Sequence, residues 1–147
     1  MEIHLKRESA DVKVPTRGSS KAAGYDLYAY IQNENGYHVI MPHETEKIHT
    51  GLSFQPPEGY FGAIFARSGL ATHYGVRPAN CCGICDQDYT GEYIVALHND
   101  SCDPVIIKNG DRIAQLIFLP YQDIDFIEVD EIKQTDRGDD GFGSTGK

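Results

Sequence analysis

Short β-rich runs separated by glycine, proline and asparagine constrain the fold of this chain more than any other feature. The runs recur about every 8–12 residues, the spacing expected of strands in a β-sandwich or barrel. They are EIHLKR, GYHVIM, EKIHTGLSF, GYFGAIFA, EYIVALHN, PVIIKNG, RIAQLIFLPY and, over residues 126–132, FIEVDEI. No amphipathic stretch is long enough for a major helix, and the best helical candidate is the short SGLATHYG, with Ser68 as its N-cap. The pattern predicts an all-β domain with one short helix.

Composition narrows the class of protein. The chain has 147 residues, of which 40% are hydrophobic, enough for one domain with a real core. Its formal net charge of -9 argues against a polymeric nucleic-acid partner, whose binding surface would be basic. No apolar run approaches the length of a membrane span. The N-terminus has no apolar core of the kind found in secretion signals, so we expect a cytoplasmic protein without structural disulfides.

The last part of the chain changes character. Residues 136–147 are rich in glycine and contain a single large apolar side chain, that of Phe142. Such a segment has too little apolar surface to fold alone. We therefore expect a β domain over residues 1–135, followed by a flexible glycine-rich arm over residues 136–147 that becomes ordered against a ligand or another chain.

Three of the four cysteines lie together, and two of them form a C-x-x-C sequence, Cys82 to Cys85. Such a pair can be a redox dithiol, half of a zinc site, or two packing residues. A redox pair would open a helix, but an acidic turn and a β-rich run follow here, which predict a hairpin. A zinc site would need two more soft ligands, and only Cys102, His73 and His98 lie near, without a regular spacing. The pattern favours buried packing residues.

Polar residues gather in four other places. Asp26 lies between apolar residues in AAGYDLYA, and Arg67 precedes the Ser68 hydroxyl at the start of the short helix, where an anion can bind. The acidic turn GICDQDYTGE follows the cysteines, and Arg112 and Gln115 lie in the strand pattern GDRIAQLIF. Taken singly, each has an ordinary explanation as a turn residue, a surface ion pair or a partner of a backbone group.

Together and in this order, these clusters and the tail RGDDGFGSTG resemble the five motifs of the dUTP pyrophosphatase (dUTPase) family, of the single-copy, trimer-forming type. The resemblance extends from about residue 22 to residue 146. It implies a dUTPase-like β-barrel or jelly-roll fold and the hydrolysis of dUTP to dUMP and pyrophosphate. It also implies a homotrimer whose active sites are shared between subunits and closed by a neighbour's arm.

The resemblance assigns a role to each matching residue. Asp86 is expected to be the general base that activates the attacking water, and the Tyr89 ring to lie against the sugar and exclude a ribose hydroxyl. The residues assigned to the uracil edge are Asn80, Gly83, Ile84, Cys85 and Ile94. Those assigned to the phosphates are Arg67, Ser68, Gly69 and Gln115, with Arg137, Gly143, Ser144 and Thr145 from the arm and Phe142 stacked on uracil.

The expected cofactor is Mg²⁺, bound through the three phosphates and without direct protein ligands, with Asp26 as a candidate partner of its hydration shell. Three positions depart from the usual family pattern. They are Ala66 in place of proline, Cys85 in place of an aliphatic residue, and two acids, Asp139 and Asp140, in the arm.

Two other functions stay open. One is a dCTP deaminase-like enzyme of the same fold, although Gly69 stands where the second serine of the deaminase's arginine-serine-serine signature would lie. The other is a dUTPase-like protein with an added regulatory binding role, whose active-site residues would be the same.

Overall fold

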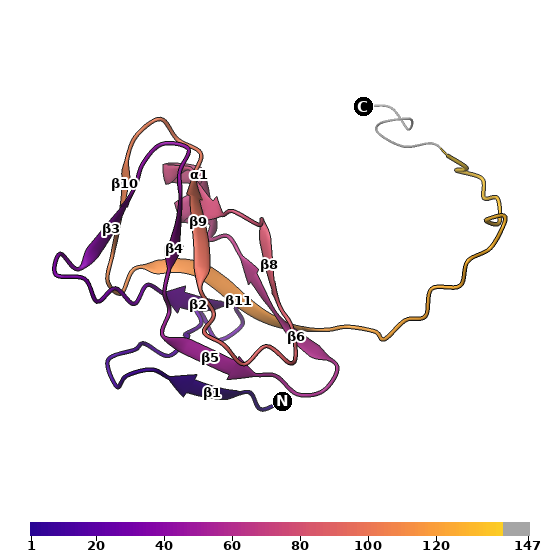
Figure 1. Cartoon of the computed structure of the whole chain (residues 1–147), viewed down its shortest axis with the longest axis horizontal. Helices are drawn as coiled ribbons and strands as arrows, with labels where there is room; N and C mark the ends of the chain where they lie inside the picture. Colours follow the sequence, from indigo (N-terminus) through magenta and orange to yellow (C-terminus); the bar gives the residue numbers. More distant parts are fainter. Residues whose placement is uncertain (140–147) are drawn as a thin grey trace.

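Eleven strands and one seven-residue helix are found in the computed structural model, which describes residues 1–139 (Figure 1). The strands are β1 (His4–Arg7), β2 (Tyr25–Tyr28), β3 (Tyr37–Ile40), β4 (Thr45–Ile48), β5 (Leu52–Gln55), β6 (Tyr60–Phe65), β7 (Val76–Pro78), β8 (Cys82–Cys85), β9 (Val95–Asn99), β10 (Val105–Lys108) and β11 (Arg112–Pro120). The helix is α1 (Ser68–Tyr74), between β6 and β7. Within the described part of the chain, no helix has the length and apolar character needed to cross a membrane.

All strand pairs are antiparallel, and they form four sheets. Two are two-stranded, β1–β5 and β3–β10, and a third has the order β4–β9–β7. The largest has the order β2–β11–β6–β8, so that the nine-residue β11 is paired on both sides and β8 lies at an edge. The sheets do not close into a complete barrel, but the predicted all-β, jelly-roll-like class is confirmed.

The core forms where the sheets face one another. Strand β9 shows the alternation expected of a half-buried strand, with Val95, Leu97 and Asn99 buried and the residues between them partly exposed. The buried Asn99 amide donates to the carbonyl oxygens of Ile40 (2.9 Å) and Asp103 (2.8 Å), so this polar side chain is satisfied within the core. The bond to Ile40 joins β9 to β3, which belong to two different sheets.

Two expectations for the strands need correction. The run EKIHTGLSF forms two strands, β4 and β5, because the chain bends at Gly51, whose φ of 67° is in the left-handed region. The expected hairpin around the acidic turn is also wrong. Strand β8 pairs with β6, whereas β9 pairs with β4 and β7, so residues 86–94 connect two different sheets.

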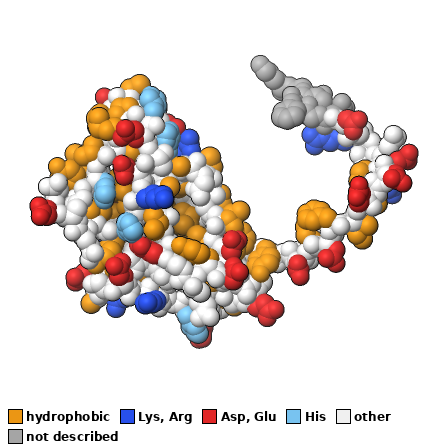
Figure 2. Space-filling model, in the orientation of Figure 1, with side chains coloured by type: hydrophobic (Ala, Val, Ile, Leu, Met, Phe, Trp, Pro, Cys, Tyr) orange, Lys and Arg blue, Asp and Glu red, His pale blue; other side chains and the backbone are white. Residues whose placement is uncertain are grey.

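The segment after β11 leaves the body of the molecule (Figure 1). Figure 2 shows apolar and acidic side chains alternating along it in full view of solvent. The expected strand over residues 126–132 is absent here, and Phe126, Ile127 and Ile132 are 92%, 82% and 82% exposed. A strand needs a neighbouring edge, and this segment pairs with none in the described chain. The boundary at residues 135/136 stays a prediction, and Phe142, Gly143, Ser144 and Thr145 lie outside the described residues.

Candidate active site

Asp26 and two arginines form the first polar group, called here the arginine cluster. The buried Asp26 carboxylate accepts from Arg67 Nε at 3.0 Å and from Arg112 Nη1 at 3.3 Å. One carboxylate between two guanidinium groups leaves a net positive charge. The side chains of Arg67 and Arg112 are 24% and 51% exposed, so this charge faces solvent and suits an anionic ligand.

Strand register links this cluster to the cysteine strand. Gln115 of β11 lies opposite Asp26 on one side and Phe65 on the other, and Phe65 in turn lies opposite Cys82 of β8. Asp26, Gln115, Phe65 and Cys82 thus form one row across the four-stranded sheet. Because neighbouring strands are about 4.8 Å apart, the row places the backbone of Asp26 about 14 Å from β8, whereas Arg67 follows β6, the strand next to β8.

Helix α1 starts beside the arginine cluster. Arg67, not Ser68, holds the N-cap position, with extended backbone angles and no side-chain capping bond. The expected N-cap is therefore wrong by one residue, because Ser68 already has helical geometry. Ser68 is exposed and Gly69 is partly exposed, so both are open to a ligand that approaches Arg67.

The second polar group surrounds a pocket of about 250 Å³, called here the β8 pocket. Seven residues that the sequence assigned to the base, the sugar and the water line it together: Asn80, Gly83, Ile84, Cys85, Asp86, Tyr89 and Ile94. They come from β8, from the turn before it and from the connection to β9. Ile64, Glu92 and Tyr93 complete the lining. Glu92 ends the acidic turn GICDQDYTGE but had no assigned role, and neither local spacing nor residue type distinguished Ile64 and Tyr93 from ordinary strand residues.

The Tyr89 ring has a defined place on the wall of this pocket. Its hydroxyl donates to the Glu92 carbonyl at 2.9 Å, and its backbone N–H donates to the Asp86 carbonyl at 3.1 Å. A Cβ at Gly91 would lie 2.5 Å from the Tyr89 hydroxyl oxygen, so only glycine leaves room for the ring. The Tyr93 ring stacks on Tyr89 with a centroid distance of 6.1 Å and an angle of 27° between the planes.

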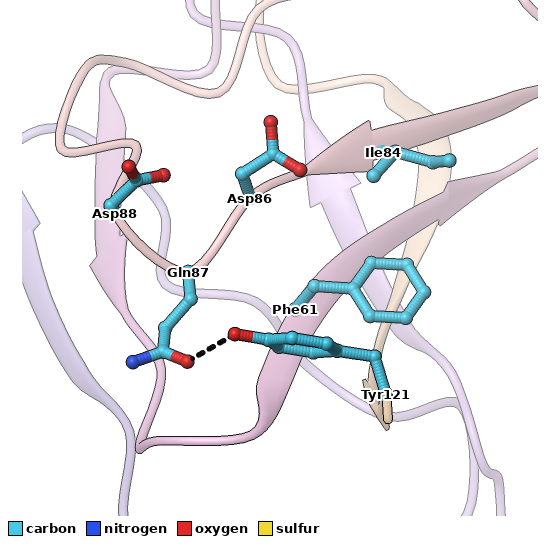
Figure 3. A pocket seen from close by; sticks show the side chains of 6 residues that line it. All are labelled: Phe61, Ile84, Asp86, Gln87, Asp88 and Tyr121. Atoms are coloured by element: carbon cyan, nitrogen blue, oxygen red, sulfur yellow. Dashed lines mark hydrogen bonds between the residues drawn. The ribbon is translucent and has the colours of Figure 1, made fainter. Parts of the chain in front are cut away.

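Asp86 is exposed at the end of β8 and also borders a wider pocket of about 600 Å³ (Figure 3). Figure 3 shows its carboxylate on the same side as Asp88, with the Phe61 and Tyr121 rings across the pocket. The Tyr121 hydroxyl donates to Gln87 Oε1 at 2.7 Å, which ties the start of the C-terminal segment to the acidic turn. Asp86 is thus open to a ligand from two sides.

The cysteines are less uniformly buried than expected. Cys81 and Cys102 are exposed, whereas Cys82 is partly buried and Cys85 packs against the core. Burial, followed by the nearby Asp86 carboxylate, raises the pKa of the Cys85 thiol to about 11. Over residues 1–139, no group of three or more histidine, cysteine or acidic side chains is placed to hold a metal ion.

The predicted site residues therefore fall into two groups. Asp86 borders two pockets, and neither is lined by Arg67, Ser68 or Gln115. Arg137 lies in a turn over residues 136–139, at the end of the described chain. The residues predicted to contact the base and the sugar line one pocket. Of those predicted to bind phosphates, Ser68 and Gly69 directly follow Arg67, and Gln115 lies opposite Asp26 in the same sheet.

Comparison with known proteins identifies the family of this chain. The family model for dUTPase matches residues 10–146. A deoxyuridine 5'-triphosphate nucleotidohydrolase of Desulfitobacterium hafniense (strain DSM 10664 / DCB-2) is 43% identical, with 99% of this chain and 95% of the relative covered. One from Kluyveromyces lactis is 42% identical, with 99% and 94% covered.

Among solved structures, a mutant dUTPase of Staphylococcus bacteriophage 80alpha with dUpNHpp matches with a TM-score of 0.83 at 25% identity, over 99% of both chains. A mutant dUTPase of phage phi11 of S. aureus matches in fold, with a TM-score of 0.79 at 21% identity, over 91% of this chain and 100% of the other. Its structure reveals the coordination of a structural Mg(II) ion in that protein. On the match to the family model and the two relatives above 40% identity, this chain belongs to the dUTPase family.

Proposed function

We propose that this protein is a dUTP diphosphatase, which hydrolyses dUTP to dUMP and pyrophosphate. One observation carries the proposal: the β8 pocket brings together the seven residues expected to contact the base, the sugar and the attacking water. Those residues span positions 80–94, and the pocket has one exposed carboxylate, Asp86, at its rim. Family membership and relatives named for this activity support the same conclusion.

The edge position of β8 suits recognition of uracil. An edge strand has backbone N–H and C=O groups that no neighbouring strand occupies. Around Gly83 and Cys85 these groups can pair with the alternating acceptors and donors of the uracil edge. Cytosine presents mismatched partners, which leaves buried polar groups unpaired, and the thymine methyl needs space that a close-fitting strand lacks.

The arginine cluster is the proposed binding site for the phosphates. Asp26 holds Arg67 in place, so the guanidinium loses less freedom when it binds a phosphate than an unpaired arginine would. The Ser68 hydroxyl and the Gln115 amide add polar groups beside it. The arm residues Arg137, Gly143, Ser144 and Thr145, with Phe142 over the base, would then close the site.

The chemical step requires a base and a leaving group. Asp86 would take a proton from a water molecule as the water oxygen attacks the α-phosphorus. The bond from the α-phosphorus to the bridging oxygen of the β-phosphate breaks, and pyrophosphate leaves with that oxygen. The other residues hold the triphosphate in line for this attack.

Magnesium fits this site only as an ion carried on the phosphates. The described chain has no cluster of acidic or histidine ligands, and both carboxylate oxygens of Asp26 face guanidinium groups. When bound, Mg²⁺ would offset phosphate charge. A role for Asp26 toward the ion's hydration shell stays a prediction. Removal of divalent cations with EDTA should lower the rate of dUTP hydrolysis, and added Mg²⁺ should restore it.

We also propose that three copies form a ring and complete each site between them. Both pockets that Asp86 borders lack the three residues of the arginine cluster, and the backbone of Asp26 lies about 14 Å from β8 along one sheet row. In such a ring the β8 pocket of one copy would face the arginine cluster of another, so that one copy binds the nucleoside and the other the phosphates. Light scattering after size-exclusion chromatography should give the mass of three chains.

Release of pyrophosphate from dUTP, dCTP, dTTP and UTP tests the activity, with ammonia release from dCTP measured in parallel. We expect pyrophosphate from dUTP at a rate at least about a hundredfold above the other three, since an added methyl or hydroxyl group costs about that factor and mismatched polar groups cost more. Ammonia from dCTP would instead indicate a deaminase. A folded protein that leaves dUTP intact in the presence of Mg²⁺ contradicts the proposal.

A further inference from the structure

We infer that Tyr93 is a positioning residue: its buried ring holds the Tyr89 ring in place and so sets the preference for deoxyribose over ribose. The inference rests on the proposed function, in which Tyr89 lies against the sugar. Tyr93 belongs to none of the residues that the motifs assigned, although it lines the β8 pocket.

The backbone of Tyr93 is fixed on both sides. Its N–H donates to the Leu52 carbonyl at 2.8 Å, and its carbonyl accepts from the Thr50 hydroxyl at 2.7 Å. Thr50 and Tyr93 are each 1% exposed, so water does not compete for these bonds. Tyr93 is therefore a rigid point next to the exposed turn that carries Tyr89.

The Tyr93 ring has neighbours on its faces. Phe54 packs against it with a centroid distance of 4.7 Å, and Tyr89 stacks on it at 6.1 Å. Phe54 also contacts Phe118 at 5.8 Å, so the ring is backed by the core. Tyr89, by contrast, is 44% exposed. Besides the stack on Tyr93, its side chain is held by a hydrogen bond from its hydroxyl to the Glu92 carbonyl. Loss of the Tyr93 ring would let the Tyr89 ring tilt toward the space left behind.

Gly62 of β6 makes room for the Tyr93 ring. A Cβ at this position would lie 2.9 Å from a ring carbon and 2.9 Å from the hydroxyl oxygen of Tyr93. Gly62 pairs with Cys85 in β8, directly before the proposed base Asp86. Any side chain at Gly62 must therefore displace Tyr93, which offers a second way to test the inference without changing Tyr93 itself.

The ring, not the hydroxyl, carries the proposed role. The Tyr93 hydroxyl is buried, and the Cys85 thiol, a weak hydrogen-bond partner, lies beside it; burial, followed by this thiol, raises the pKa of the hydroxyl. No hydrogen bond joins this hydroxyl to Tyr89, so the stack depends on the ring. Phenylalanine at this position keeps the ring and should keep the preference, whereas leucine removes the ring and should not.

The experiment compares kcat/KM for dUTP and for UTP in wild type, Tyr93→Phe, Tyr93→Leu and Ile40→Ala. We expect Tyr93→Leu to lower the dUTP-to-UTP ratio by about two- to tenfold, the worth of one aromatic pair, and Tyr93→Phe to keep the ratio. Most of the loss should lie in the KM for dUTP, because the sugar contact is made on binding. Ile40→Ala is the matched control, since Ile40 is fully buried in β3 and lines neither Asp86 pocket.

Gly62→Ala adds a second arm. It should lower the same ratio by displacing the ring, and the double variant Gly62→Ala with Tyr93→Leu should be no worse than Tyr93→Leu alone, because both changes act through one contact. The inference would be overturned if the double variant lowered the dUTP-to-UTP ratio by the product of the two single effects. It would also be overturned by a folded Tyr93→Leu protein with the wild-type ratio, by a Tyr93→Phe protein that loses the ratio equally, or by an Ile40→Ala protein that loses it too.

The outcomes also separate this inference from the proposed function. If folded wild type fails to hydrolyse dUTP, the proposed function fails. If wild type hydrolyses dUTP and the Tyr93 variants keep its ratio, only the positioning role is wrong. Far-UV circular dichroism of each variant shows whether it is folded.

Discussion

The β8 pocket and the arginine cluster lie on one sheet but are held together by different forces. In the β8 pocket, rings and backbone are in contact: Tyr89 stacks on Tyr93 and closes over Gly91. In the arginine cluster, charge dominates, with one buried carboxylate between two partly exposed guanidinium groups. Packing defines a shape that can distinguish a neutral base and sugar, whereas charge attracts an anion with little regard for shape.

The largest effect should come from Asp86, which lines the β8 pocket but is proposed to activate the water that attacks the phosphate. Asp86→Asn keeps the size of the side chain and removes its basicity, so turnover of dUTP should fall by about 10²–10⁴-fold while dUTP still binds. Steady-state kcat and calorimetric binding make the measurement. Asp88→Asn changes another carboxylate of the same wider pocket and serves as the comparison; its turnover of dUTP should fall much less. Parental turnover in the Asp86→Asn protein would remove Asp86 as the base.

Removal of the arm should have the next largest effect, because the arm is proposed to cover both groups at once. A chain that ends after Asp136 lacks Arg137 and the glycine-rich motif, so the triphosphate is less well aligned for attack. Turnover should fall by about 10²-fold, with the oligomeric state unchanged. Size-exclusion chromatography gives the oligomeric state of the truncated chain, and kcat for dUTP is measured on the same preparation. Full turnover would show that the arm is not part of the site.

Asp26→Asn tests the charge-based region alone. Loss of the carboxylate leaves two guanidinium groups close together without their shared partner, and we expect a loss of about 1–3 kcal/mol in the free energy of unfolding. The KM for dUTP should rise, whereas the dUTP-to-UTP ratio, which we propose is set by the β8 pocket, should stay the same. Urea unfolding and steady-state kinetics provide the values.

Asp111→Asn is the matched control for this change. Asp111 is exposed and accepts a backbone bond from Lys108 that an asparagine oxygen can also accept. Its unfolding free energy should change by less than about 0.5 kcal/mol. Equal losses of unfolding free energy in Asp26→Asn and Asp111→Asn would mean that the arginine cluster stabilises the fold no more than an exposed side-chain hydrogen bond does.

The smallest effect concerns the packing side of the comparison. Burial raises the pKa of Cys85 from 9.0 to about 11, so the folded protein holds the thiol proton that the unfolded chain loses. This contribution to stability is complete below pH 9 and is lost as the pH rises toward 11. Cys85→Val should therefore lose less stability than wild type between these pH values, with turnover at pH 7.5 within about tenfold. Identical pH profiles in thermal unfolding would contradict the assignment.

Much of this protein was readable from local patterns. The spacing of β-rich runs predicted the all-β class, and most runs became strands because alternation and turn residues act over a few positions. The order of the polar motifs indicated the family and located seven of the ten residues that line the β8 pocket. Contacts between residues that are close in the sequence, such as Tyr89 and Gly91, can be predicted without knowing the rest of the chain.

Tertiary structure alone decided which segments meet. The partners of Asp26 lie 41 and 86 residues along the chain, and Tyr93, on which Tyr89 stacks, contacts Phe54 of β5 and Gly62 of β6. The same reason explains the errors: β8 pairs with β6 and not with β9, and residues 126–132, despite a strand-like sequence, pair with no strand within residues 1–139. A strand pattern states that a segment can pair, but the free energy of pairing and stacking depends on distant residues brought together by the fold.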